Sequence, residues 1–165
     1  MIFFAALMVL TLAAALASRA GVPGLPTWPA RMRIALAAAL WFFGTDHLFN
    51  IDRYLAMMPG FVPWPAETVV FTGLCEIAGG FGLLVPRVRR LAGIMLALYF
   101  VAVFPANIKN AIDGLSVDGL PSVSWYYWAR LLFQPLAVWW ALYAAEVIAW
   151  PHGCREPARV LGTQA

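Results

Sequence analysis

Polar side chains that bind ligands or move protons stand inside or at the ends of long apolar runs in this chain. Glu76 lies near the middle of one run, where an ionisable group is costly and must face protein or water. The other members of the set are Asp46, His47, Asn50, Asn107, Arg130 and Gln134. Carboxyl, imidazole, amide and guanidinium groups together can hydrogen-bond a small ligand and exchange protons with it.

Helical spacing and depth indicate which of these groups can meet. Residues 46 and 50 share a helix face, as do 47 and 50, and Arg130 and Gln134 are four residues apart. Glu76 lies eight residues below Thr68, about 12 Å from that end of a helix. These depths allow a pair between Glu76 and Arg130, or a relay to Glu76 through His47 or Gln134. If no partner comes close, burial should leave the Glu76 carboxyl neutral near pH 7.

Composition identifies the class of protein that must position these groups. Of 165 residues, 63% are hydrophobic and only 12% are charged, which is far from soluble globular usage. The sequence predicts an integral membrane protein with one membrane domain over residues 1–165, in contact with the lipid bilayer. The net charge of +3 is explained by membrane topology, so we expect no nucleic-acid partner.

Five apolar runs predict an all-α, multi-pass transmembrane helical bundle. The expected spans are residues 1–18, 34–50, 68–85, 91–107 and 129–150. Gly73, Gly79, Gly80 and Gly82 surround Glu76, so neighbouring helices should approach this span closely. Pro105 should kink or stop the fourth span, and Pro151 should end the fifth. Trp125 to Trp128 are typical of an aromatic belt at the membrane interface.

The first run has a second interpretation as a cleaved signal peptide, because Ala15 to Ala17 resemble a cleavage site. A signal peptide carries basic residues before its apolar core, whereas here Arg19 follows it. This order favours a retained helix.

The basic residues predict an orientation. Five spans place eight of the eleven on one side: Arg19, Arg31, Arg33, Arg87, Arg89, Arg90, Arg155 and Arg159. The other side has Arg53, Lys109 and Arg130, with the acidic residues Asp46, Asp52, Glu67, Asp113 and Asp118. The positive-inside rule then places the N-terminus outside and the C-terminus in the cytoplasm. The polar set lies in the outer half.

Each candidate also has a purely structural interpretation. Glu76 can serve helix packing as a neutral, hydrogen-bonded acid, and His47 can be a solvated or core histidine. Arg130 can be a snorkelling interface anchor, while Asn107 and Gln134 can join helices through their amides. No short metal-ligand spacing occurs, so we predict no metal site, and no cofactor motif is evident.

The ordered motifs resemble the DoxX family of small bacterial membrane proteins over roughly residues 34–142. The matching stretches are residues 44–49, 57–63, 73–80, 86–90 and 104–107, followed by Arg130 and Gln134. The resemblance implies a four-helix transmembrane core, with the first span as an extra N-terminal helix, in the bacterial cytoplasmic membrane. It also implies a link to redox systems such as thiosulfate:quinone oxidoreductases.

Three functions follow as hypotheses. The first is a membrane subunit that binds a quinone headgroup in an outer-half pocket and receives electrons from a redox partner protein, and is not a stand-alone enzyme. The second is a non-enzymatic structural or assembly protein. The third is a small proton-coupled permease with Glu76 as the carrier, which at this length would act as an oligomer and lacks the internal repeat typical of transporters.

Overall fold

The computed structural model describes residues 2–114 and 124–149, and within these ranges every regular element is a helix. The helices are α1 (Ile2–Arg19), α2 (Trp28–Phe49), α3 (Ile51–Leu55), α4 (Pro65–Leu84), α5 (Arg89–Ala102), α6 (Phe104–Asp113) and α7 (Ser124–Ala144). The predicted all-α class is confirmed. Asp118, Arg155 and Arg159 of the topology prediction lie outside the described residues, as do Trp150 and Pro151.

Three helical segments of the described chain are long and apolar enough to cross a membrane. They are α1, α4 and the segment Arg89–Asp113, which joins α5 to α6. At 22 and 21 residues, α2 and α7 are also long enough to span a bilayer's hydrocarbon core. They are less apolar: α2 includes Arg31, Arg33 and Asp46, and α7 includes Arg130 and Gln134.

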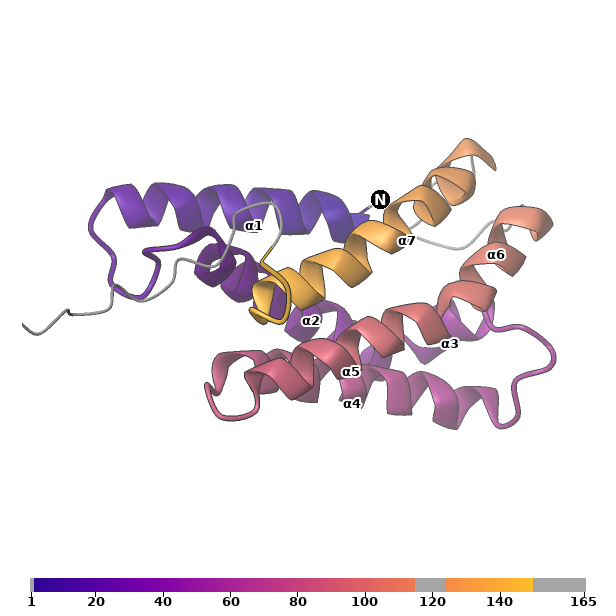
Figure 1. Cartoon of the computed structure of the whole chain (residues 1–165). Helices are drawn as coiled ribbons and strands as arrows, with labels where there is room; N and C mark the ends of the chain where they lie inside the picture. Colours follow the sequence, from indigo (N-terminus) through magenta and orange to yellow (C-terminus); the bar gives the residue numbers. More distant parts are fainter. Residues whose placement is uncertain (1, 115–123, 150–165) are drawn as a thin grey trace, which may run out of the picture.

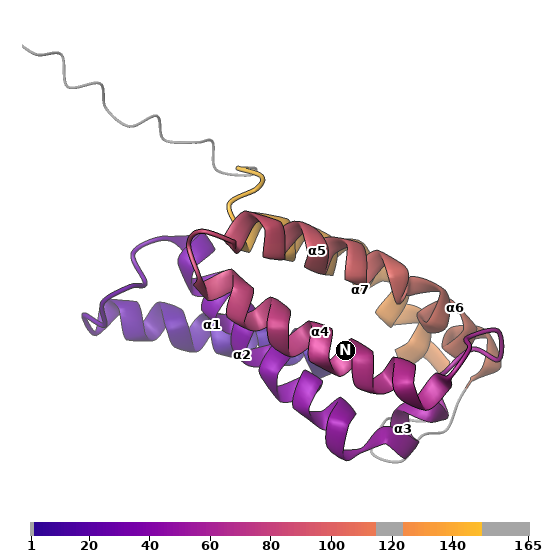
Figure 2. The ribbon, with the colours of Figure 1, turned by 90° about the horizontal axis from the view of Figure 1, so that it is seen from below.

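The helix contacts define a bundle built around α2. Helix α2 lies between α1 and α4 and also packs against α7, while α5 contacts both α4 and α7 (Figures 1 and 2). Thus α2, α4, α5 and α7 contact one another in a closed ring, and α1 lies outside it against α2. Helix α6 bends away from α5 and packs on α7.

Small residues set the distance between α2 and α4. A Cβ atom added at Gly44 would lie 2.8 Å from the carbonyl oxygen of Gly73, and one added at Gly73 would lie 2.7 Å from that of Gly44. Because the obstacle is backbone on both sides, only glycine fits this crossing. The predicted close approach around Glu76 is confirmed, and it holds α2 beside that carboxyl.

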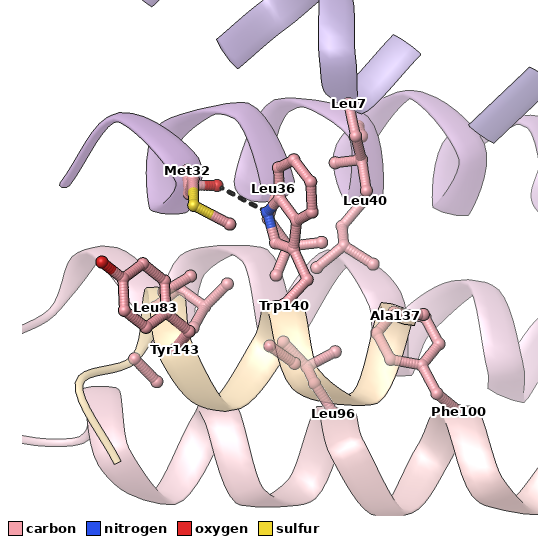
Figure 3. Close-up of a cluster of buried hydrophobic side chains, with 14 residues drawn as sticks. Leu7, Met32, Leu36, Leu40, Leu83, Leu96, Phe100, Ala137, Trp140 and Tyr143 are labelled. Carbon is pink, nitrogen blue, oxygen red and sulfur yellow. Dashed lines mark hydrogen bonds between the residues drawn. The ribbon is translucent and has the colours of Figure 1, made fainter. Parts of the chain in front are cut away.

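An apolar core fills the end of the bundle away from α3 and α6. Leu36 and Leu40 of α2 meet Leu83 of α4, Leu96 of α5 and Trp140 of α7, and all five are buried. Figure 3 shows the Trp140 side chain directed at α2, where Nε1 donates a hydrogen bond to the Met32 carbonyl at 3.2 Å. The indole thus buries its ring and satisfies its only donor.

Several helices begin earlier than predicted, and one of them is α7, which is already helical at Ser124, five residues before the predicted start at 129. Helix α2 begins at Trp28 and not at residue 34, since the Thr27 side chain accepts from the Ala30 amide at 3.4 Å and Pro29 fits the first turn. Helix α4 likewise begins at Pro65, three residues before the predicted start. The predicted loop 51–67 includes the short helix α3.

The predicted break at Pro105 is confirmed. Helix α5 ends at Ala102, and Pro105 lies in the first turn of α6, where its missing amide hydrogen removes no helical bond. The bend places Asn107 on α6 and turns that helix over α7.

Helix α7 runs from Ser124 to Ala144, so the predicted end at residue 150 was wrong. The chain turns at Glu146, whose φ of 59° is left-handed, while the Val147 amide donates to the Leu142 carbonyl at 2.9 Å. This is the Schellman arrangement that ends many helices. Among the aromatics predicted to form an interface belt, Trp125 and Trp128 are exposed and the two tyrosines between them are buried.

Candidate functional site

A cavity of about 370 Å³ lies at the end of the bundle formed by α3, α6 and the start of α7. Its lining includes six of the seven predicted site residues: Asp46, His47, Glu76, Asn107, Arg130 and Gln134. Asn50 does not line the cavity, and instead donates a hydrogen bond to Asp46. Residues that are distant in sequence therefore reach a single space.

Glu76 lies on α4, at the side of the cavity that faces α2 and α5. Its side chain is buried, with 7% of the residue exposed. Oε1 accepts a hydrogen bond from the Tyr99 hydroxyl of α5 at 2.7 Å. Oε2 is buried without a hydrogen-bond partner among the described residues, and its distance of 3.7 Å to His47 Nδ1 is too long for a hydrogen bond. One oxygen of this carboxyl therefore keeps hydrogen-bonding capacity that the described residues leave unused.

His47 is held beside Glu76 by its own helix. Its Nδ1 lies 2.7 Å from the Phe43 carbonyl, one turn earlier in α2. A carbonyl only accepts, so Nδ1 must carry a hydrogen. In the neutral ring Nε2 is then the nitrogen that can accept a hydrogen bond or take up a proton. The ring stacks on Tyr54 of α3 with centroids 3.8 Å apart. His47 thus lies between the Glu76 carboxyl and Tyr54 of α3.

Asp46 fastens α3 over this end of α2. Its carboxylate accepts from the Tyr54 hydroxyl at 2.6 Å, from Arg53 at 3.0 Å and from Asn50 Nδ2 at 2.6 Å. Burial, and then the hydrogen bond to Asp46, raise the pKa of Tyr54 well above its ordinary value near 10, so this hydroxyl stays a donor. Asp46 and Asn50 therefore hold α3 in place.

A second polar network follows α6 and α7 on the other side of the cavity. Arg130 donates to Asn107 Oδ1 at 2.9 Å, and Asn107 Nδ2 donates to Gln134 Oε1 at 3.1 Å. The Gln134 amide in turn donates to the Phe100 carbonyl. These bonds order three side chains from the start of α7 towards the interior of the bundle.

Of the alternatives left open for Glu76, the pair with Arg130 does not form. Within the described residues no ion pair joins them, because Arg130 is engaged by Asn107 and Glu76 by Tyr99. Of the predicted relays, the structure brings His47 to within 3.7 Å of Glu76, whereas Gln134 belongs to the other network.

The sequence prediction missed several polar lining residues, among them Tyr54, Tyr99 and Asn110. A signal for two of them exists, since Tyr99, Val103, Asn107 and Asn110 follow one another at helical spacing and form one stripe. Asn110 is 2% exposed, and its Oδ1 has no partner in the described chain. Like Glu76 Oε2, it is an unused hydrogen-bonding atom at the cavity.

Apolar side chains complete the cavity wall. Phe42 and Phe43 of α2, Phe100 of α5, and Phe3 and Phe4 of α1 all line it. A concave site with apolar walls and a few polar groups is the usual form of a small-molecule site. In the described part of the chain, no group of three or more His, Cys, Asp or Glu side chains could hold a metal ion.

A family model described as a domain of unknown function, DUF8561, matches residues 36–145. The chain belongs to this family. The DUF8561 domain begins within α2 and ends just after α7, so it contains both polar networks and excludes α1. Neither the curated proteins nor the solved structures include a match to this chain.

Proposed function

We propose that this protein is a membrane subunit that binds the headgroup of a quinone in the cavity and exchanges protons with it through Glu76. The observation that carries the proposal is the buried Glu76 carboxyl, with one oxygen held by Tyr99 and the other without a partner beside His47. An ionisable group at membrane depth usually serves transport, binding or catalysis.

The chemistry of the two networks suits such a ligand. Quinone oxygens accept hydrogen bonds, which the amides of Asn107 and Gln134 and the Arg130 guanidinium can donate. Quinol hydroxyls donate, which suits a Glu76 carboxylate. Reduction of a quinone to a quinol consumes two electrons and two protons. Glu76 would supply one of these protons and the His47 imidazole the other, and a redox partner protein would supply both electrons.

The same proposal includes the membrane arrangement. We place α2, α4, the α5–α6 segment and α7 as a DoxX-like four-helix core, with α1 as an added span, in a bacterial cytoplasmic membrane. The closed ring of contacts among these helices supports this core. The distribution of basic residues supports an outward-facing cavity with the N-terminus outside.

Titration of the purified protein with a short-chain, water-soluble quinone analogue tests the proposal. We expect saturable binding by the unmodified protein and about tenfold weaker binding by Glu76→Gln, the equivalent of roughly 1.4 kcal/mol. The control is Glu67→Gln, the same substitution at an exposed position of α4, which should bind normally. Equal affinity in all three proteins, or no binding at all, would reject the proposal.

A structural or assembly role is the second candidate, because most polar bonds at the cavity join helices of the chain to one another. Asp46 ties α3 to α2, and Asn107 ties α6 to α7. In that case Glu76→Gln lowers the melting temperature of the purified protein and affects no separable ligand-dependent property.

A further inference from the structure

The first turn of α1 forms one side of the cavity, although α1 lies outside the DUF8561 domain. Phe3 packs on Phe43 and Phe100, with ring centroids 5.4 Å and 6.0 Å away. Phe4 packs on Phe133 of α7 at 4.9 Å. Both phenylalanines are only half-buried. Two aromatic rings thus close the cavity on the side where α1 approaches α7 (Figure 1).

Helix α1 is a thin wall between this cavity and the surroundings of the bundle. It packs along its length only against α2, and touches the other helices only at a few side chains. Its opposite face consists of apolar side chains that are more than half exposed, among them Met8, Val9 and Leu12. In a membrane, that face contacts lipid. Phe3 and Phe4 therefore stand between the cavity and the hydrocarbon of the bilayer.

The size of the cavity restricts what it can enclose. At about 370 Å³ it is near the lower end of the range for small-molecule sites, and it suits a single substituted ring. A long hydrocarbon tail attached to that ring must leave the cavity. Asp46 and Arg53 form one charged side of the cavity, and Arg130 forms another. A tail that left on either side would cover ionic groups, which costs free energy because they lose contact with water. The phenylalanine side is apolar.

We infer that Phe3 and Phe4 bind the hydrocarbon tail of a lipid-soluble ring ligand where it passes from the cavity into the bilayer between α1 and α7. The inference rests on the proposed function, because it names the path of the tail of a ligand whose ring lies beside Glu76. It makes α1 a part of the binding site that the DUF8561 domain alone does not supply.

The test compares two quinone analogues with the same ring, one without a tail and one with a decyl tail, on the full-length protein in nanodiscs. Dissociation constants for the tailed analogue are expressed as concentrations within the bilayer, which removes simple partitioning. We expect Phe3→Ala and Phe4→Ala each to raise the dissociation constant of the tailed analogue at least fivefold, and that of the tailless analogue less than twofold. Met8→Ala and Leu12→Ala, on the exposed face of the same helix, should change neither constant.

The outcomes separate this inference from the proposed function. If the unmodified protein binds neither analogue, the proposed function fails and the inference fails with it. If it binds both, and the phenylalanine variants change neither constant or both constants equally, only the tail path is rejected. Circular dichroism checks that each variant is folded. If Phe4→Ala does not fold, Phe4→Leu replaces it, because leucine keeps an apolar side chain. A two- to fivefold loss of affinity for the tailed analogue alone would then support the same path.

Discussion

At the scale of single residues, the contact between Tyr99 and Glu76 is the most informative one in the cavity. A carboxyl this deeply buried depends on its few hydrogen bonds, because the loss of one partner leaves a desolvated polar atom. Tyr99 gives Oε1 that partner at 2.7 Å, while Oε2 keeps none among the described residues. The site is therefore asymmetric, with one oxygen held and one free to act.

We expect Tyr99→Phe to lower the free energy of unfolding by about 1–3 kcal/mol, because Oε1 of Glu76 would lose its donor inside the bundle. Unfolding in mixed micelles measures this change. The double-mutant cycle with Glu76→Leu, which removes the acceptor, should give a coupling energy of about 1 kcal/mol or more. Strictly additive effects would show that the hydrogen bond contributes no stability.

Tyr99 also illustrates what the sequence conceals. A tyrosine within an apolar run resembles any other aromatic core residue, and its hydroxyl becomes relevant only when α5 packs beside α4. Glu76, Asn107 and Gln134 were predictable, because each is conspicuous in an apolar helix. Their partners were not, since a choice between Arg130 and Tyr99 as the partner of Glu76 depends on how the helices are rotated.

At the scale of helices, the crossing of α2 and α4 positions His47 relative to Glu76. Gly44 and Gly73 lie where the two backbones meet, and a Cβ at Gly73 would also come within 2.8 Å of the His47 Cβ. Any separation of the helices would move the imidazole away from the carboxyl. Glycines around Glu76 already predicted a close approach, but the partner helix was unknown without the structure.

Gly73→Ala should therefore destabilise the protein by about 1–3 kcal/mol, because the added methyl group meets backbone that cannot rotate away. The variant should also lower the affinity for any ligand that Glu76 binds. Thermal unfolding in detergent measures the first effect. Gly60→Ala is the control, since nothing lies within 4 Å of its added Cβ, and it should be neutral. A Gly73→Ala protein of unchanged stability would contradict so close a crossing of α2 and α4.

The inner end of α7 shows why some helix ends could not be predicted. Arg33, which the sequence places before the second span, is buried and donates to the Ala144 carbonyl at 3.3 Å. Glu146 pairs with Arg89 at 3.2 Å and lies 3.7 Å from Arg33. Two arginines distant in sequence thus fix the turn at Glu146, and neither has a local signal for that role.

We expect Glu146→Gln to lower the free energy of unfolding by about 1 kcal/mol, since the carboxylate is half-exposed and its two ion pairs are partly screened. The loss should shrink at high salt, which distinguishes it from a packing defect. Chemical unfolding at low and high salt measures it. A destabilisation that does not respond to salt would show that the charge of Glu146 is not what fixes this turn.

At the scale of the molecule, the proposed orientation determines which side would supply protons to the cavity. In that proposal, five spans place the two termini on opposite sides of the membrane and the cavity faces outward. Epitope tags at both ends, probed in spheroplasts, test this arrangement. We expect the N-terminal tag to be detected in intact cells and the C-terminal tag only after lysis. Both tags on one side would require an even number of spans and would contradict the proposed topology.

The central claim is that the cavity beside Glu76 holds a quinone. Native mass spectrometry of the protein, purified gently from membranes, tests it most directly. We predict a bound species with the mass of a membrane quinone, and a clearly smaller bound fraction in Glu76→Gln than in the Glu67→Gln control. Protein that is free of any quinone, or equal occupancy in both variants, would contradict the claim.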